Sequence, residues 1–401
     1  MAGTGSDHRA CWRLDPDVVF LNHGSFGACP CAVLEVQQAL RDVMEADPVH
    51  FFLRELEPRL DSARAALATF LGARADDLAF VTNTTTGVNA VLRSLSFAPG
   101  DELLVTDQAY NACANAVRYA AERSGARVLV VPLPFPLAGP DAVVDAVLAG
   151  VTPRTRLALL DHVTSPTGLV LPIERLVPAL AARGVDALID GAHAAGMLAL
   201  DLDSLGAAYY TGNCHKWVCA PKGAGFLHVR RDRQAAIRPV AISHGFNSPR
   251  TDRSRFRLEF DWTGTMDPTP YLCVPEAIRY LGSLIGGGWP AVRARNRGLA
   301  LEARRLVADA LDVALPCPDA MVESLVALPL PDGSPPPPGA LDPLQERLFT
   351  EDRIEVPVFP WPAPPRRLVR FSVQLYNGRT DYERLARALA RLVLLPGPAG
   401  Q

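Results

Sequence analysis

The chain has 401 residues, of which 49% are hydrophobic and 21% are charged, and its formal net charge is −3. This length and apolar content suffice for one large domain and a smaller one. The sequence shows no basic excess typical of nucleic-acid binding and no polybasic run suited to a membrane surface. No apolar run approaches the roughly 18–20 residues of a membrane span. We therefore expect neither nucleic acid nor a membrane as a partner.

Residues 1–14 are polar and lack the apolar core of a signal peptide, so we expect a cytoplasmic protein. The eight cysteines are scattered along the chain, which argues against a disulfide framework. Cys29 and Cys31 form a close pair, but their spacing fits neither a zinc site nor a CxxC redox motif. We therefore interpret them as packing residues and predict no metal site.

The first part of the chain predicts a short strand followed by helices. Segment 18–30 (VVFLNHGSFGACP) begins with apolar residues and ends in a turn, where Gly24 and Gly27 allow close backbone approach. Across segment 32–71 the apolar residues recur at helical spacing. Pro48 interrupts this pattern and predicts a helix–helix junction.

From residue 78 onward, predicted strands and helices alternate. Short, nearly continuous apolar strands with amphipathic helices between them are typical of a mostly parallel sheet covered on both faces. The predicted strands span residues 78–82, 102–106, 127–131, 156–163, 185–190, 207–211 and 223–229. In such sheets, ligands bind at the carboxyl ends of the strands. Polar residues gather at five of these ends, which predicts one cleft lined by residues 82–86, 107–110, 161–165, 190–193 and 211–216.

After Arg250 the pattern changes to that of an α+β unit. Its predicted helices and strands surround a proline-rich loop at residues 331–338, and they span residues 275–285, 289–311, 321–330, 354–359, 368–376 and 381–395. We predict a division into three parts. A segment at 1–45 packs with the small domain, a large α/β domain spans 46–285, and the small C-terminal α+β domain spans 286–401.

Lys216 draws attention because Lys216 and Lys222 are the only lysines among 40 Lys and Arg residues. Arginine stays protonated, whereas lysine in a dry site can lose its proton and form a Schiff base with a carbonyl. Asp190 closes a predicted buried strand and needs a cationic or hydrogen-bonding partner. A protonated pyridine nitrogen is such a partner. The alternative is that chance left two lysines and that Asp190 is an ordinary structural carboxylate.

Two further strand ends fit this interpretation. Segment 83–89 (NTTTGVN) joins a strand to a helix, and backbone N–H groups and hydroxyls at a helix N-terminus bind phosphate. Ordinary helix capping by threonine explains the same residues. Tyr110 begins a helix after another strand, where its ring would stack on a cofactor or pack in the core.

An ordered set of motifs covers nearly the whole chain, namely LNHGSFG (21–27), TNTTTGVN (82–89), DHVTSPTG (161–168), DGAHAAGM (190–197), GNCHKWVCAPKGAGF (212–226), DWTGTMDP (261–268) and VRFSVQLYN (369–377). This set resembles the class-V aminotransferase family of fold-type I pyridoxal-phosphate enzymes. Within the family it is most similar to the isopenicillin N epimerase-like branch. The resemblance implies a large domain with a mostly parallel, seven-stranded sheet and a smaller α+β C-terminal domain.

The resemblance also implies a role for each matching residue around pyridoxal 5'-phosphate. Lys216 would form the Schiff base and later act as the acid and base at Cα. Asp190 would bind the pyridine nitrogen, and His193 would contact the phenolic oxygen. Tyr110 would stack on the ring, where relatives often have histidine, and Ser165 would lie near the ring oxygen.

The remaining implied residues hold the phosphate and the substrate. The phosphate would be bound by Thr84, Thr85, Asn213 and His215. Gly264 and Thr265 would reach the phosphate of the partner subunit, which implies a homodimer with shared active sites. Arg370 would clamp the carboxylate of an amino-acid substrate by a bidentate pair. Further candidates on the substrate side, each with an equally good structural explanation, are His23, Arg54 and His244.

The implied cofactor chemistry begins with loss of the Cα proton, and three outcomes stay open. Reprotonation from the opposite face, with Tyr110 or a histidine as the second acid, gives epimerisation. Loss of a β-thiolate or sulfenate gives a C–S lyase, as in cysteine desulfhydrases and ergothioneine-pathway relatives, and release of a keto acid gives transamination. A persulfide-forming desulfurase is disfavoured because segment 354–367 has no cysteine and Cys317 lies upstream. A non-enzymatic binding protein on the same scaffold is the least favoured alternative.

Overall fold

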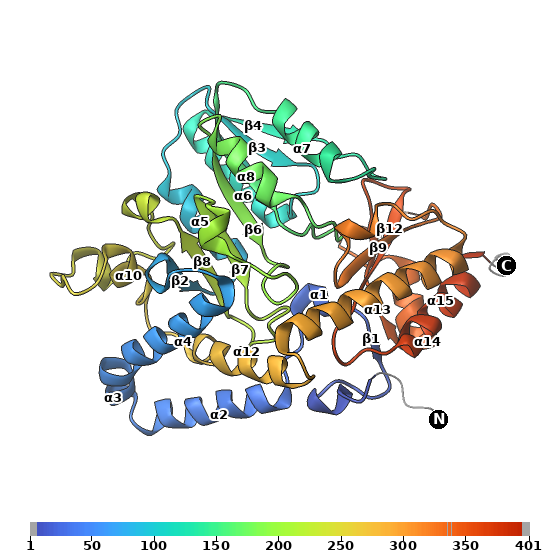
Figure 1. Cartoon of the computed structure of the whole chain (residues 1–401), viewed down its shortest axis with the longest axis horizontal. Coiled ribbons are helices and arrows are strands. Elements are labelled where there is room, and N and C mark those ends of the chain that lie inside the picture. Colours follow the sequence, from blue (N-terminus) through green and yellow to red (C-terminus); the bar gives the residue numbers. More distant parts are fainter. Residues whose placement is uncertain (1–5, 335, 338, 395–401) are drawn as a thin grey trace.

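A seven-stranded sheet forms the centre of the larger part of the molecule (Figure 1). The computed structural model describes residues 6–334, 336–337 and 339–394, so residues 1–5 and 395–401 of the predicted terminal parts, and positions 335 and 338 of the predicted proline-rich loop, lie outside it. In spatial order, the strands are β2 (Leu78–Val81), β8 (Gly225–Val229), β7 (Tyr209–Asn213), β6 (Asp186–Gly191), β5 (Thr155–Asp161), β3 (Glu102–Thr106) and β4 (Arg127–Val131). β8 is antiparallel to both of its neighbours, and the other neighbouring strands are parallel. The predicted mostly parallel sheet is confirmed.

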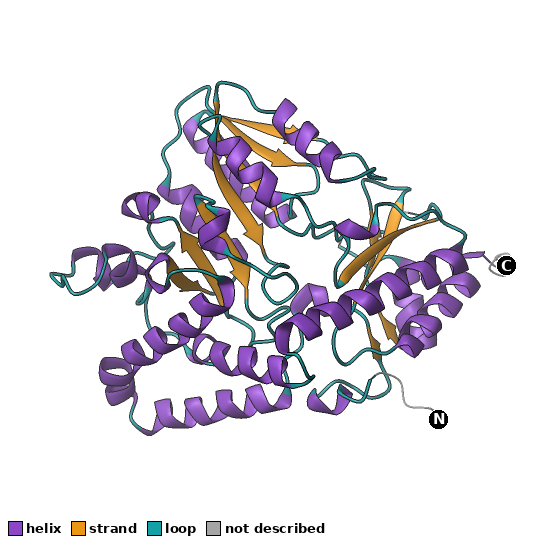
Figure 2. Cartoon of the chain, in the orientation of Figure 1, coloured by secondary structure: helices purple, strands orange, loops and turns teal. Residues whose placement is uncertain are grey.

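Helices cover both faces of this sheet, as Figure 2 shows. Successive strand residues point to opposite faces, so Leu103 and Val105 join one apolar cluster while Leu104 joins the other. The first face packs against α5 (Thr84–Ser94), α6 (Asn111–Ser124) and α10 (Arg255–Phe260). The second packs against α4 (Leu56–Leu71), α7 (Pro140–Ala149), α8 (Ile173–Ala181) and α12 (Val274–Ser283). Burial on both faces explains the nearly continuous apolar sequence of these strands.

The N-terminal helices wrap around the lower edge of the large sheet in Figure 1. They are α1 (His23–Phe26), α2 (Cys31–Ala46), α3 (Pro48–His50), a π-helical turn (Phe51–Glu55) and then α4. The junction predicted from Pro48 lies at α3, where the Asp47 carboxylate accepts the backbone N–H of His50. Two short helices elsewhere in this part are α9 (Leu202–Leu205) and α11 (Thr269–Leu272).

The C-terminal part contains a three-stranded antiparallel sheet in the order β11 (Val358–Pro360), β12 (Arg367–Ser372) and β9 (Leu325–Leu330). Its helices are α13 (Gly288–Leu311), α14 (Pro343–Asp352) and α15 (Arg379–Leu394). The predicted strand 368–376 ends early, at Ser372, because Gln374 and Asn377 form a turn through backbone and side-chain hydrogen bonds. Near the N-terminus, β1 (Val19–Phe20) pairs in parallel with β10 (Ile354–Glu355). The predicted domain boundaries themselves stay predictions.

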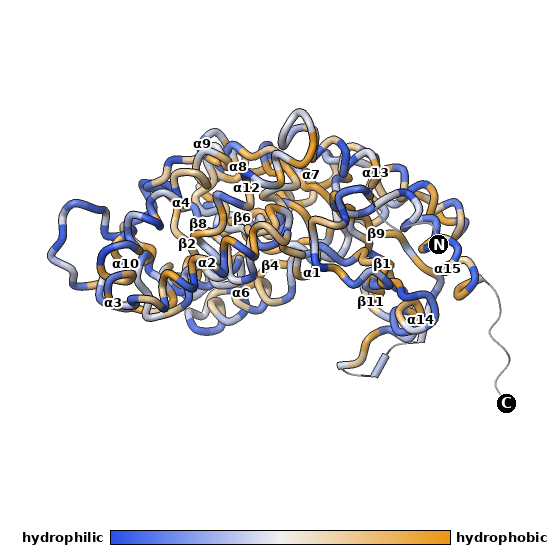
Figure 3. The backbone as a smooth tube through the Cα atoms, turned by 90° about the horizontal axis from the view of Figure 1, so that it is seen from below, coloured by the Kyte–Doolittle hydropathy of each residue, from blue (hydrophilic) through white to orange (hydrophobic). Residues whose placement is uncertain are grey.

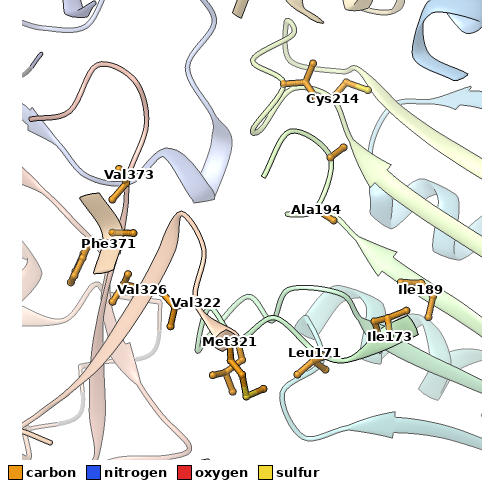
Figure 4. Close-up of a cluster of buried hydrophobic side chains, with 14 of the residues drawn as sticks. Leu171, Ile173, Ile189, Ala194, Cys214, Met321, Val322, Val326, Phe371 and Val373 are labelled. Carbon is orange, nitrogen blue, oxygen red and sulfur yellow. The ribbon is translucent and has the colours of Figure 1, made fainter. Parts of the chain in front are cut away.

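One apolar core continues from the large sheet into the C-terminal part. Figure 4 shows Leu171 and Ile173 beside Met321 and Val322, with Phe371 of β12 beyond them. The backbone N–H of Val170 also donates to the Met321 carbonyl at 3.0 Å. This packing fixes β12 relative to the ends of the large sheet.

The hydropathy of the chain follows this arrangement. In Figure 3, apolar segments concentrate along the middle of the molecule, while the loop beyond α10 is strongly hydrophilic. Among the described residues, no helix combines the length and apolarity that crossing a membrane requires.

Candidate active site

Three neighbouring parallel strands carry polar residues at or next to their last position, namely Asp161 (β5), Asp190 (β6) and Asn213 (β7). Asp161 and Asp190 are register partners, so their side chains leave the sheet on the same face. All three side chains are buried. The structure therefore brings together the strand ends that the sequence predicted to form a cleft.

Lys216 lies in the turn that follows β7, and its amine lies close to the imidazole of His193. Nζ of Lys216 is 3.3 Å from Nε2 of His193, and Nδ1 of His193 accepts the indole N–H of Trp217 at 3.2 Å. Burial, followed by the positive charge of Arg370, lowers the pKa of Lys216 to about 8. About a tenth of this amine is therefore neutral, and nucleophilic, at pH 7.

Asp190 has two hydrogen-bond donors and a carboxyl neighbour. The backbone N–H of Ala192 donates to its Oδ1 at 2.9 Å, and the thiol of Cys113 donates to its Oδ2 at 3.1 Å. Burial raises the pKa of Asp190, and burial together with the Asp190 charge raises that of Asp161 well above its usual range. One carboxyl of this buried pair therefore stays protonated, and the single negative charge that remains calls for a cation, which a protonated pyridine nitrogen supplies.

The sequence predicted that segment 161–165 lines the cleft, but it gave neither Asp161 nor Cys113 a role of its own. The backbone N–H of Tyr110 faces the Asp161 carboxyl group and lowers its pKa, which opposes the larger effect of burial. Cys113, in the first turn of α6, contacts Asp190 from the same side. The position of Asp161 at a strand end was a usable signal, whereas nothing in the local sequence marked Cys113.

The first turn of α5 has the properties of a phosphate site. The side chain of Asn83 caps the helix, and Oδ1 of Asn213 accepts the Thr84 N–H at 2.9 Å. The hydroxyl of Thr84 is buried and has no hydrogen-bond partner within the described residues. Half-buried Thr85 lies next to it. A phosphate at this helix N-terminus would satisfy the hydroxyl that the protein leaves unpaired.

His215 lies beside Lys216 in the turn after β7. Its Nδ1 is 2.9 Å from the Ala224 carbonyl oxygen, and burial lowers its pKa to about 4. Nδ1 is therefore the protonated donor, and Nε2 remains available as an acceptor. Its predicted contact with the phosphate stays a prediction.

Arg370 enters the site from β12 of the C-terminal part. Its Nη1 donates to the Ser165 carbonyl at 2.6 Å and to the Ser165 hydroxyl at 3.1 Å, and its Nη2 donates to the Ser25 hydroxyl at 3.0 Å. Nε is buried without a partner among the described residues. The guanidinium also lies 5.7 Å from the centre of the Phe359 ring. These contacts orient the guanidinium of Arg370. Ser165 therefore serves as a hydrogen-bond acceptor for Arg370, and its predicted position near the ring oxygen stays a prediction.

His23 lies directly behind the lysine. Its Nδ1 is 2.8 Å from the Tyr376 hydroxyl, and its Nε2 is 3.0 Å from the Lys216 carbonyl oxygen. The side chain is fully buried, and burial lowers its pKa to about 3. These contacts support the backbone of the lysine turn, and the predicted contact of His23 with substrate stays a prediction.

Gly24 and Gly27, in the segment before α2, are explained by close packing against neighbouring residues of the site. Gly27 has φ = 71°, and a Cβ atom there would collide with the carbonyl oxygen of His215. Gly24 donates its N–H to the Ser372 hydroxyl at 2.9 Å, and a Cβ atom on it would lie 3.5 Å from His193. The N-terminal segment thus lies between β12 and the Lys216 turn.

Tyr110 lies at the margin of this cluster, because it is 46% exposed while its phenol is near enough to Arg370 to raise the pKa of that arginine. Other predicted residues lie outside the cluster. Arg54 and His244 are exposed, and so is Thr265, while Gly264 lines a cavity of about 130 Å³ together with Phe52 and Trp262. Within the part of the chain that the structure describes, none of these side chains forms a hydrogen bond or ion pair with Lys216, Asp190 or Arg370.

All eight cysteines have free thiols. Cys317 is buried, and its Sγ lies 3.4 Å from a guanidinium nitrogen of Arg304. Burial raises its pKa, which keeps it a thiol. Because segment 354–367 also lacks cysteine, no thiol precedes Arg370 in the position that a persulfide-forming mechanism needs.

Residues 18–312 match the aminotransferase class-V family. The chain belongs to this family. It is 40% identical to the isopenicillin N epimerase of Amycolatopsis lactamdurans over 94% of this chain and 96% of that protein. It is 31% identical to the probable chloroplastic L-cysteine desulfhydrase of Arabidopsis thaliana over 94% of this chain and 84% of that protein.

A solved structure shows the same fold. The complex of a cystine C–S lyase with its product cysteine persulfide has a TM-score of 0.77 and 24% identity, and it covers 93% of this chain and 97% of that chain. The predicted family, its isopenicillin N epimerase-like branch and the predicted fold are confirmed. Because class-V family members are pyridoxal-phosphate enzymes, the predicted cofactor and enzyme class are confirmed as well.

Proposed function

We propose that this enzyme inverts the configuration at Cα of an amino-acid substrate. The observation that carries the proposal is the 40% identity to an isopenicillin N epimerase over almost the whole of both chains. Identity to the L-cysteine desulfhydrase is lower, at 31%, over the same share of this chain. The buried amine of Lys216 supplies the base that such a reaction requires.

The residues of the site fit pyridoxal phosphate. Bound there, the cofactor supplies an aldehyde for covalent attachment and a ring that delocalises the negative charge left when Cα loses its proton. Lys216 would bind it covalently, and the carboxylate of Asp190 would face its ring nitrogen. The unpaired hydroxyl of Thr84 and the N-terminus of α5 would hold its phosphate.

Arg370 and Lys216 have different roles toward the substrate. Arg370 binds the substrate carboxylate, and its contacts with Ser165 and Ser25 hold the guanidinium in place while it does so. Lys216 takes the Cα proton on its own face of the substrate. Because both groups are buried, their charges act at low dielectric and orient the substrate strongly.

Tyr110 would return the proton on the opposite face. Tyr110 is 46% exposed, and its phenol is near enough to Arg370 to raise the pKa of that arginine, so it would face the substrate and exchange protons with solvent. An enzyme that only eliminates a β-substituent has no need of this second group. Tyr110 is therefore the residue on which inversion would depend.

We also propose a homodimer in which Gly264 and Thr265 serve the active site of the partner subunit. Both residues lie outside the Lys216 cluster. Cavities beside them are lined by apolar side chains that are strongly exposed, including Leu53 (77%), Val240 (41%) and Met266 (37%). An exposed apolar surface of this kind is typical of a subunit interface.

Incubation in heavy water tests the reaction type. Isopenicillin N, the compound in the name of the relative, and L-cysteine serve as probes. Deuterium at Cα together with inversion there, seen as formation of the Cα epimer of isopenicillin N or as loss of optical activity from L-cysteine, supports the proposal. Pyruvate and sulfide from L-cysteine, without inversion of either probe, would overturn it in favour of β-elimination, the second candidate supported by the desulfhydrase relative. Lys216→Ala is the control and is expected to abolish both outcomes.

A further inference from the structure

A second cluster of chemically competent side chains lies away from Lys216. Asp77 ends a 3-10 helix (Ala75–Asp77) before β2, Asp203 belongs to α9, and His228 belongs to β8. One ligand atom from each residue lies within 4.8 Å of the others. His228 is three residues along β8 from Gly225, which pairs with Asn213 at the active-site edge. The cluster is therefore roughly 10 Å along the strand from that edge.

His228 is the most informative member of the cluster. Its side chain is only 4% exposed, and neither ring nitrogen has a hydrogen-bond partner among the described residues. Its Nε2 lies 3.7 Å from Oδ1 of Asp203, which is too far for a hydrogen bond. Buried imidazoles normally find a partner, so this one needs an explanation.

The neighbouring side chains orient the carboxylate of Asp77. Gln234 donates to Oδ1 of Asp77 at 2.7 Å, and Arg231 lies 3.4 Å from the same oxygen. Arg74 is 4.0 Å from Oδ2 of Asp77. Hydrogen bonds of this kind hold metal-binding carboxylates in place. Asp203 is 44% exposed and gives an ion a path from solvent.

We propose that Asp77, Asp203 and His228 bind a divalent transition-metal ion of the zinc class. One imidazole nitrogen and two carboxylate oxygens suit zinc, with water as a further ligand, whereas magnesium and calcium favour a shell of oxygens alone. The ion joins three separate elements, namely the segment before β2, the strand β8 and the helix α9. It therefore stabilises this edge of the large sheet and takes no part in the chemistry at Lys216.

Titration calorimetry of the chelator-washed holoenzyme with zinc chloride tests the proposal. The decisive variant is Asp203→Asn, which removes one ligand on the surface. The matched control is Asp76→Asn, because Asp76 adjoins Asp77 in the 3-10 helix, is 64% exposed and is outside the cluster. We expect one zinc ion per chain in wild type and Asp76→Asn, and an affinity lower by about tenfold or more in Asp203→Asn. Added zinc should raise the Tm of the first two proteins only.

Two results would overturn the proposal. One is the absence of stoichiometric zinc binding in wild type, and the other is equal binding by Asp203→Asn and Asp76→Asn. Cobalt substitution distinguishes a thiol site, because Cys11 and Cys31 are partly exposed. A thiolate-to-cobalt charge-transfer band would assign the ion to cysteine and also overturn the proposal. His228→Gln should abolish zinc binding. If His228→Gln does not fold, the comparison of Asp203→Asn with wild type decides whether the site exists.

Discussion

The indole N–H of Trp217 donates to Nδ1 of His193 at 3.2 Å, and this contact fixes the tautomer of the histidine. An indole nitrogen can only donate, so Nδ1 carries a lone pair. Burial lowers the pKa of His193 well below its usual value, so the ring is neutral and its single proton lies on Nε2. That proton points toward Nζ of Lys216, 3.3 Å away. The neutral form of the amine can accept this hydrogen bond, whereas the ammonium form cannot.

Replacing Trp217 with phenylalanine should allow His193 to adopt both neutral tautomers. Without the indole donor, Nδ1 is free to take the proton, and the Nε2 donor disappears in part of the molecules. We expect kcat to fall by about 10- to 100-fold, the usual effect of losing a group that orients a reactive side chain. Nitrogen NMR of labelled histidine should show a mixture of tautomers. Trp289→Phe removes an indole donor that bonds to the Ile278 carbonyl instead, and an equal effect there would contradict the assignment.

The pKa of Lys216 predicts how cofactor loading depends on pH. Only the neutral amine attacks the cofactor aldehyde, and the pKa is about 8. The rate of reconstitution of the cofactor-free enzyme should therefore rise with pH and level off above about pH 8. Below that pH it should fall by about tenfold per unit. Stopped-flow absorbance of the bound cofactor measures this rate, and a flat profile between pH 6 and pH 9 would contradict the prediction.

Arg370→Gln should shift the pH dependence of the reconstitution rate to higher pH. The positive charge of Arg370 disfavours the ammonium form of Lys216, so removing it raises the pKa of the lysine. Reconstitution at neutral pH becomes slower, and the plateau is reached later. Arg366→Gln is the matched control, because it removes an exposed arginine from the start of the same region. Substrate binding should weaken in the Arg370 variant only.

The order of the motifs along the chain predicted most of this architecture. Each predicted strand of the large sheet exists, and the polar strand ends converge, because burial on both faces leaves a strong apolar signal. Contacts between distant residues left no such signal. His23 contacts Tyr376, 353 positions away, and Arg370 contacts Ser165, 205 positions away. Such pairs depend on how the N-terminal segment and β12 close over the sheet.

Replacement by asparagine should be tolerated at Asp161 and should reduce activity at Asp190. They are buried register partners, and their mutual repulsion keeps one carboxyl protonated. Because the pKa of Asp161 is raised well above its usual range, asparagine imitates its neutral form. Asp161→Asn should retain cofactor affinity and activity within a few-fold of wild type. Asp190→Asn removes the charge opposite the ring nitrogen and should reduce kcat by about 100-fold or more. Equal losses would show that both carboxyls are ionised.

Thr84→Val should weaken cofactor binding without destabilising the cofactor-free protein. The Thr84 hydroxyl is buried and unpaired within the described residues, so the protein loses no hydrogen bond when the hydroxyl is removed. A phosphate that uses this hydroxyl loses one, which corresponds to about a tenfold weaker Kd. Thr86→Val is the control, because the Thr86 hydroxyl is already bonded to Thr82. Fluorescence titration gives the affinity, and thermal unfolding gives the stability.

The proposed shared active site predicts complementation between two inactive variants. Lys216→Ala lacks the base, and Thr265→Asp places a negative charge where the phosphate of the partner subunit would bind. In a mixed dimer, one site combines an intact Lys216 with an intact Thr265 from the other chain, and the second site lacks both. Random assembly makes half of the dimers mixed, so co-expression should restore about a quarter of wild-type activity. If each chain instead supplies its own Thr265, no site in any dimer contains both groups, and the co-expressed protein stays inactive.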